Sequence, residues 1–530
     1  MNQPYSPPQS RAALSGSRIA VAPARRDHAG AKRHSRRVGL LRIALPVAAL
    51  AGVALYVSTL RGGGETEAPP ADPPALTEEI LADEAMVMQA PRMAGFQEDG
   101  RPYRIEAERA MQRADDADLI ELETVRAAFT LDDSDARVTA DRGVYDSAGA
   151  MLTLDGRVTI TTDAGLSARF ENAEIALDTG TITSDEPVAI ESDGRVIRGN
   201  RLVITEGGDA LSLTDGVILT AAEPAAAQPA GGDGMFGSLG GGGSFEISAD
   251  SLEQVVVDGR PRFTFSGEVA AVRGDTTITA PTMVVSAPPG AEGSASFDRM
   301  VASGGVTIDA GGRRVTGTDA EVDLAANTLR VTGGTTIRDG ESRLSGGTMR
   351  ADMAAGTVMV EGGRVRFFSP GAGGGGGGGG GAFGAFRTGS GGPTEIVADR
   401  FSQTPRDGGG ALLTFSGNVV ADRGGSIVRA PTLTVLVPGG AGGAMDSASF
   451  ERIEASGGVE VRADRQTATG ANAVFNMAAG TIVMTGAVSV TDGNQTLSGD
   501  RLTVDMNSGV MTMEPLTRAI ITPRGGAGLP

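Results

Sequence analysis

The chain has 530 residues, 80 of them glycine and none of them cysteine or tryptophan, and its formal net charge is −19. The absence of cysteine excludes disulfides, thiolate nucleophiles and Cys-ligated metals. The only histidines, His28 and His34, lie in a basic N-terminal tail, so no histidine is available downstream for acid–base work or metal binding. Abundant glycine and only 4% aromatic residues predict an all-β protein with many turns.

The charge is distributed unevenly along the chain. Residues 1–61 hold ten Lys and Arg residues but a single acid, Asp27, so the remaining chain carries a formal charge of −28. An acidic body of this size repels the phosphates of nucleic acid. We therefore expect no nucleic-acid partner.

An apolar segment follows the basic tail. Residues 43–60 are uncharged and mostly apolar, and as a helix they span roughly 27 Å, close to the ~30 Å hydrocarbon thickness of a bilayer. We predict a single transmembrane helix over residues 38–60, with the basic tail, residues 1–37, in the cytoplasm and the body exported. A cleaved signal peptide is the alternative, disfavoured because the basic segment and the apolar run are both long.

Three stretches rich in Gly, Ala or Pro divide the exported part. They are residues 61–84, 221–244 and 369–393, and we interpret them as linkers that bury little apolar surface. Between them lie three blocks, residues 85–220, 245–368 and 394–515, followed by a tail at 516–530. The sequence leaves open whether the glycine-rich linkers interrupt a sheet.

The blocks are related by internal duplication. The segment FTFSGEVAAVRGDTTITAPTMVV from Phe263 matches LTFSGNVVADRGGSIVRAPTLTV from Leu413 at an offset of 150 residues. The starts of all three blocks also resemble one another: YRIEAERAMQ from Tyr103, FEISADSLEQ from Phe245 and TEIVADRFSQ from Thr394. We infer three copies of one module, the first of them divergent.

A shorter unit of alternating apolar residues recurs within each copy. The landmarks Gly156, Pro187 and Gly216 stand 31 and 29 residues apart, and Gly156 lies on the apolar face of its run. A period of two with an in-phase glycine predicts a strand that bends between two sheets while its apolar side stays inward. The candidate lipid-binding residues form this apolar stripe: Leu152, Leu154, Val158, Ile160, Leu329, Val331, Ile337, Ile482, Met484 and Val490.

Most such stripes are simply core, but the scarcity of rings favours a partly open interior, which suits acyl chains. Catalytic and metal sites are not expected. The acidic cluster of Asp115, Asp116 and Asp118 lacks the spacing of a calcium loop, and the glycine-rich runs lack the Lys of a phosphate-binding loop. We predict no catalytic residue, no cofactor and no enzymatic activity.

The segment ADRGVYDSAGAMLTLDGRVTI, residues 140–160, resembles the lipopolysaccharide export protein family LptC. The later copies, with TFSGNV at Thr414 and ASGGV at Ala302 and Ala455, resemble the OstA-like module of the LptA family. The resemblance implies tandem β-jellyrolls of stacked antiparallel strands in a V, an LptC-like one over residues 85–220 and OstA-like ones over residues 245–368 and 394–515.

The resemblance also implies a function. The chain would be a single-pass inner-membrane protein with a periplasmic body, which accepts lipid A acyl chains in an apolar groove and passes them toward the outer membrane. The implied partners are lipopolysaccharide, the subunits of the inner-membrane lipopolysaccharide-export ABC transporter, and an LptA-like bridge protein that joins by edge-strand addition.

Two rival functions stay open. The first is a ligand-free, membrane-tethered β-solenoid that serves as envelope scaffold or adhesin, and the second is an exported polysaccharide hydrolase, weakened by the lack of clustered carboxylates. Because lipopolysaccharide is anionic and the body is acidic, affinity would come from apolar burial and local arginines. Arg157 and Arg195 are the candidates for those contacts.

Overall fold

The computed structural model describes residues 86–521, except 99, 114–115, 131–134, 164, 193, 206–209, 222–235, 237–238, 240–243, 259, 288–296, 371–392, 408, 440–449 and 494. The chain divides into the units Met1–Leu81 and Ala82–Pro530, and the described residues belong to the second. The predicted transmembrane helix, residues 38–60, lies outside them. Within them, no helix has both the length and the apolar character that a bilayer crossing requires.

The described part consists of β-strands joined in one 31-stranded antiparallel sheet. We call β1–β14 the N-terminal module, β15–β23 the middle module and β24–β31 the C-terminal module. The N-terminal module contains β1 (Val87–Gln89), β2 (Arg92–Phe96), β3 (Pro102–Glu106), β4 (Arg109–Gln112), β5 (Leu119–Thr130), β6 (Asp135–Asp146), β7 (Met151–Thr162), β8 (Ser167–Ala176), β9 (Thr181–Ser184), β10 (Val188–Ser192), β11 (Arg195–Gly199), β12 (Arg201–Thr205), β13 (Ala210–Thr214) and β14 (Val217–Ala221). The middle module contains β15 (Phe245–Ala249), β16 (Ser251–Val257), β17 (Arg260–Arg273), β18 (Thr276–Ser286), β19 (Arg299–Ala310), β20 (Arg313–Asp323), β21 (Thr328–Asp339), β22 (Ser342–Asp352) and β23 (Thr357–Ser369). The C-terminal module contains β24 (Thr394–Pro405), β25 (Gly410–Arg423), β26 (Ser426–Pro438), β27 (Arg452–Ala463), β28 (Gln466–Asn476), β29 (Thr481–Asp492), β30 (Gln495–Asp505) and β31 (Met511–Ile521).

Each long strand bends near its middle, so the sheet folds into two facing walls. In β21, residues up to Thr332 pair within one wall and residues from Thr335 pair within the other, with a register shift between them. We call the wall that contains Val331 wall A and the wall that contains Ile337 wall B. In part of the N-terminal module the bend becomes a break, and two short strands such as β9 and β10 replace one long strand.

Glycine makes the bend possible because the backbone there has positive φ. Gly333 and Gly334 have φ values of 82° and 81°, which L side chains rarely adopt. A Cβ at Gly333 would also collide with the Thr318 side chain of the preceding strand. Gly156 and Gly486 bend their strands with φ values of 77° and 84°, as the in-phase glycines predict.

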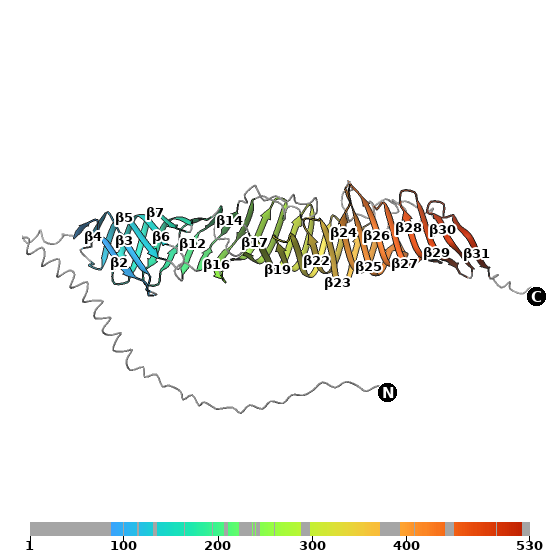
Figure 1. Ribbon diagram of the computed structural model, residues 1–530, viewed down its shortest axis with the longest axis horizontal. Helices are drawn as coiled ribbons and strands as arrows, with labels where there is room; N and C mark the ends of the chain where they lie inside the picture. The colour runs from blue at the N-terminus through green and yellow to red at the C-terminus, as the bar shows by residue number, and fades with distance from the viewer. Residues whose placement is uncertain are drawn as a thin grey trace, which may run out of the picture. The chain divides into compact units, whose positions relative to one another are not determined.

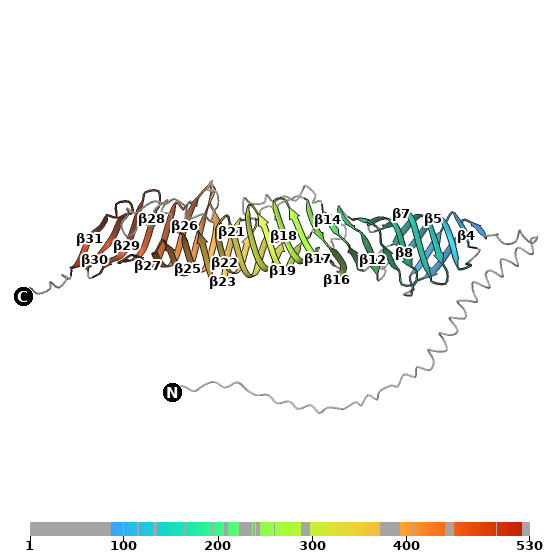
Figure 2. The same cartoon turned by 180° about the vertical axis from the view of Figure 1, so that it is seen from behind.

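The glycine-rich segments do not interrupt the sheet. β14 pairs with β15 through Ala221 and Phe245 on either side of residues 222–244, and β23 pairs with β24 through Ser369 and Thr394 on either side of residues 370–393. The three modules therefore follow one another along the body in chain order, in both side views (Figures 1 and 2).

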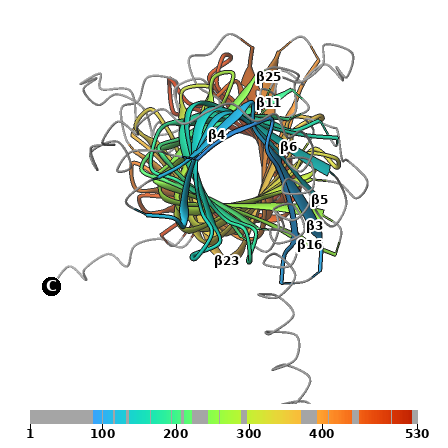
Figure 3. The ribbon, with the colours of Figure 1, turned by 90° about the vertical axis from the view of Figure 1, so that its left-hand side faces the viewer.

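The core is a single apolar cluster that extends from Ile105 to Met506. Seen along its length, the body shows strands arranged around a common axis (Figure 3), and inward side chains of both walls occupy the space between them. The alternation of apolar and polar residues places one face of each strand in this interior, because successive side chains point to opposite faces.

Candidate functional site

The two walls meet at the bends and end at turns on the opposite side. We call these rows of turns rim A and rim B, after their walls, and the space between them the mouth. Turn 146–150 belongs to rim A, and turn 162–166 belongs to rim B. An apolar ligand that enters the interior from the side must pass between the rims.

All ten predicted lipid-binding residues lie in the interior. Each is at most 4% exposed and belongs to the common core cluster. Leu152 and Leu154 lie on wall A, and Val158 and Ile160 lie on wall B, so the bend brings them to one interior. Residues that line a closed groove and residues of an ordinary core are equally buried, so burial does not distinguish the two. Contact of these residues with lipid stays a prediction.

Two small cavities lie between the walls in the described part. One of about 110 Å³ lies in the N-terminal module and one of about 20 Å³ lies in the C-terminal module. The larger one is smaller than the ~150 Å³ cavity that accepts a benzene molecule. With the walls in this position, neither cavity has room for an acyl chain.

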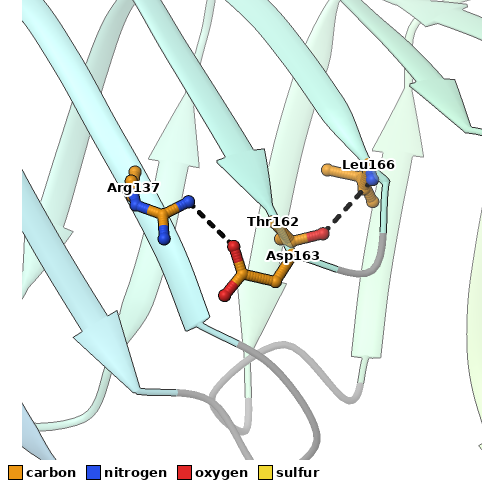
Figure 4. Close-up of polar contacts among 4 residues, drawn as sticks. All are labelled: Arg137, Thr162, Asp163 and Leu166. Carbon is orange, nitrogen blue, oxygen red and sulfur yellow. Dashed lines mark hydrogen bonds and ion pairs between the residues drawn. The ribbon is translucent and has the colours of Figure 1, made fainter.

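In the N-terminal module a turn crosses the mouth. The amide of Glu98, in the turn between β2 and β3 on rim B, donates to the carbonyl of Asp178 on rim A at 2.8 Å. The larger cavity lies between these rims and is lined by Ile160 and Leu166. Figure 4 shows the adjoining turn, in which Thr162 Oγ1 accepts the Leu166 amide at 3.2 Å.

In the middle module aromatic rings bridge the rims. Phe297 on rim A lies 5.9 Å from Phe245 on rim B and 5.8 Å from Phe263, measured between ring centroids. The guanidinium of Arg195 lies over the Phe263 and Phe297 rings at 5.6 and 5.8 Å. Such ring pairs and cation–π contacts each stabilise by roughly 0.5–1.5 kcal/mol.

The predicted linker 221–244 contributes to this closure. Phe236 and Leu239 are both buried in the core cluster. The carbonyl of Leu239 accepts a hydrogen bond from Nη1 of the buried Arg273, at 2.9 Å. Composition predicts only a linker here, because the two apolar residues are separated from any strand pattern by glycines.

In the C-terminal module a different set of rings closes the mouth. Phe450 on rim A lies 6.3 Å from Phe367 of wall B, and Phe367 lies 5.8 Å from Phe415 of wall A. Phe401 and Phe415 are neighbours within wall A at 5.1 Å. Phe450 corresponds to Phe297 in the duplicated sequence, so this rim residue is an aromatic ring in both later copies.

The structure separates the two arginines that the sequence suggests. Arg157 lies at an exposed bend, where it forms an ion pair with Asp141 at 2.8 Å. Hydrogen bonding from Arg157 lowers the pKa of Asp141. Arg157 is thus outside the interior and already paired, whereas Arg195 is buried at the mouth.

Two further buried arginines at rim B, Arg273 and Arg423, are missed by the sequence analysis. They occupy matching positions of the duplicated segments VAAVRGDTT and VVADRGGSI. An alignment of the two copies therefore identifies these arginines as a shared feature of the later modules. Among the described residues, no group of three or more acidic or histidine side chains is placed to hold a metal ion.

Both ends of the sheet carry strands with one unpaired edge, as far as the described residues show. β31 pairs only with β30 and exposes Leu516 and Ile520, and at the other end β1 pairs only with β4 and exposes Val87 and Met88. An unpaired strand edge with exposed apolar side chains is a template for pairing with another chain.

Comparisons with known proteins give two family matches. The model of LptC-related lipopolysaccharide-assembly proteins matches residues 47–217, and the model of the LptA/(LptD N-terminal domain) LPS transport protein matches residues 246–357 and 395–510. No curated protein matches significantly. Among solved structures, the chain is similar to LptH of Pseudomonas aeruginosa, described as the LptA homologous periplasmic component of the lipopolysaccharide transport device, at 16% identity over 25% of this chain and 96% of that one, with a TM-score of 0.21.

Proposed function

Because the chain belongs to the LptC-related family of lipopolysaccharide-assembly proteins and carries two modules of the LptA/LptD N-terminal type, we propose that it conveys lipopolysaccharide across the periplasm. Its interior accepts lipid A acyl chains from the inner-membrane ABC transporter and passes them toward the outer membrane. The predicted helix over residues 38–60 anchors it in the inner membrane, with residues 1–37 in the cytoplasm.

The observation that carries this proposal is the continuity of the interior. One apolar cluster runs through all three modules, and strand pairing persists across both glycine-rich segments. A core that only stabilised three separate domains would not need paired strands at their junctions. A single uninterrupted interior supports transfer of acyl chains from one module to the next without exposure to water, which costs about 25 cal/mol per Å² of apolar surface.

Because side chains fill the space between the walls, acyl chains can enter only by displacing contacts between the walls. The walls are joined covalently only through the bends, and their facing side chains meet through apolar contacts rather than a hydrogen-bonded ladder. Acyl chains enter by separating the rims and replacing wall-to-wall contacts with chain-to-wall contacts of the same kind. Because the exchanged contacts are both apolar, the free energy of the exchange is small, as a conveyor requires.

The unpaired strand edges at the two ends of the sheet are the surfaces at which partner proteins bind. The exposed apolar residues of β31 fit strand addition by an LptA-like bridge protein, with main-chain hydrogen bonds that continue the sheet. Two LptA-type modules within one chain shorten the distance that separate bridge subunits must cover.

Photocrosslinking tests this function. Crosslinkers at the inward positions Leu154, Ile160, Val331 and Met484 in the full chain should capture lipopolysaccharide in cells, and those at the outward positions Thr153 and Thr159 should not. Thr153 and Thr159 are next to Leu154 and Ile160 on β7, so they are matched controls for those two positions.

The second candidate is a ligand-free envelope scaffold, and the filled interior is the observation that favours it. A scaffold predicts no capture from any inward position. It also predicts that depletion of the protein leaves lipopolysaccharide traffic unchanged, whereas a conveyor predicts accumulation at the inner membrane.

A further inference from the structure

The rim of the C-terminal module holds two buried polar side chains side by side. Arg423, the last residue of β25, and Thr394, the first residue of β24, are paired across the two strands, and each is 5% exposed. Residues directly opposite in adjacent strands have Cβ atoms roughly 4.5–5.5 Å apart. The two side chains therefore begin at adjacent points of the rim, and both line the same cavity.

Both groups lack partners within the described part of the chain. Arg423 Nε and Thr394 Oγ1 are buried there without a hydrogen bond. Arg195 Nη1 and Arg273 Nε are also buried without a hydrogen bond, but both side chains have other contacts, because Arg195 lies on two rings and Arg273 donates to the Leu239 carbonyl. Arg313 pairs with Asp339 at 2.8 Å. Buried polar groups are nearly always satisfied, and an exception calls for an explanation.

The two groups share a small cavity with an apolar lining. It measures about 20 Å³, and its other walls include Ile396, Phe450 and Phe475. Burial lowers the pKa of Arg423, but a guanidinium stays protonated in proteins. A fixed positive charge and a hydroxyl donor therefore face an apolar space at the point where a ligand would enter.

We propose that Arg423 and Thr394 form a binding site for the anionic headgroup of an acylated lipid, a phosphate monoester, whose acyl chain enters beside Phe450. Guanidinium and hydroxyl donors together match the oxygens of a phosphate, and the surrounding rings match the adjoining hydrocarbon. The site rests on the proposed function and gives the acidic body a local cationic contact for an anionic cargo.

Calorimetric titration of the detergent-extracted full chain tests this site, with monododecyl phosphate, inorganic phosphate and dodecanol as probes. Monododecyl phosphate should bind most tightly, and Arg423→Gln should weaken it about tenfold or more because a charged hydrogen bond is lost. Thr394→Val should weaken it about threefold. Arg273→Gln, at the matching position of the middle module, should leave it unchanged.

Equal binding by the Arg423→Gln chain would overturn the site, and inorganic phosphate binding as tightly as monododecyl phosphate would overturn its assignment to a lipid. Hydrogen exchange in β25 and β26 should be unchanged in Arg423→Gln, which excludes a folding defect as the cause. Capture of lipopolysaccharide at Leu154, Val331 and Met484 together with an Arg423-independent titration would refute this site alone. Failure of capture at those positions in the otherwise unchanged chain would refute the proposed function itself.

Discussion

The middle and C-terminal modules place the same residue types at the same rim but use them differently. In the middle module, Arg273 donates to the Leu239 carbonyl, and Phe245, the residue paired with Arg273, packs on Phe297. In the C-terminal module, Thr394 stands where Phe245 stands, and Arg423 faces a cavity. A duplicated fold thus carries an arginine hydrogen-bonded to a carbonyl in one copy and, among the described residues, an arginine without a hydrogen bond in the other.

The difference between the rims shows which features the fold needs for stability and which it does not need. The bends, walls and core follow the same pattern in both modules, so the fold does not require an unpaired arginine. In the middle module the matching arginine, Arg273, donates from Nη1 to the Leu239 carbonyl, although its Nε is buried without a hydrogen bond, as Arg423 Nε is. Retention of buried, unsatisfied Arg423 and Thr394 in the other copy is the kind of local cost that functional sites carry.

The largest expected effects concern the rings at rim A. Phe297→Ala and Phe450→Ala should each destabilise their module by about 3–5 kcal/mol, as large-to-small core changes do. Phe297→Ala should cost roughly 1 kcal/mol more, because the guanidinium of Arg195 also lies over the Phe297 ring, at 5.8 Å. Local opening free energies from hydrogen exchange measure both, and equal costs would contradict the tighter closure of the middle module.

Replacing the bend glycine by alanine should destabilise the middle and C-terminal modules equally, because their bends have the same geometry. Gly267 and Gly417 have φ values of 76° and 77°. A Cβ at Gly267 would collide with Asp250, between β15 and β16, and a Cβ at Gly417 would collide with Asp399 of β24. Gly267→Ala and Gly417→Ala should each cost about 2–3 kcal/mol from backbone strain and this collision. Gly425→Ala is the control, because φ is positive there but no atom lies within 4 Å, and it should cost less. A clear difference between the first two variants would show that the modules differ beyond the rim.

The smallest expected effect is a change in stability that differs in sign between the matching arginine variants of the two modules. Arg273→Met removes the hydrogen bond to Leu239 and should destabilise the middle module by about 1–3 kcal/mol. Arg423→Met removes a buried charge without a partner among the described residues and should leave the C-terminal module unchanged or slightly more stable. Protection of β17 and of β25 against hydrogen exchange reports the two effects separately. Destabilisation by both variants would mean that Arg423 is structural.

The sequence predicts the fold well because the fold is periodic. Alternating residues such as Leu152 and Leu154 identify the inward face, and an in-phase glycine such as Gly333 identifies the bend. The resemblance to the LptC and LptA families is confirmed by the family matches. These features are local or repeat along the chain, so they can be predicted without tertiary contacts.

The contents of the interior and of the mouth could not be predicted in the same way. Wall spacing depends on how side chains from opposite walls interlock, so scarcity of rings alone does not determine how much space lies between the walls. Phe236 and Leu239 reach the core from a glycine-rich segment with no periodicity. The pairing of Thr394 with Arg423 depends on the register of two strands, which the sequence does not specify.

The central claim is that the walls must part for lipid to pass, and crosslinking across the walls tests it most directly. Because the chain has no native cysteine, Phe367→Cys/Phe415→Cys can be joined by a short, reductant-cleavable thiol crosslinker across the two walls. Phe401→Cys/Phe415→Cys, joined within wall A, is the matched control. The account predicts that the first crosslink abolishes lipopolysaccharide capture at Met484 until reductant is added, while the control crosslink preserves it. Undiminished capture with the walls joined would contradict it.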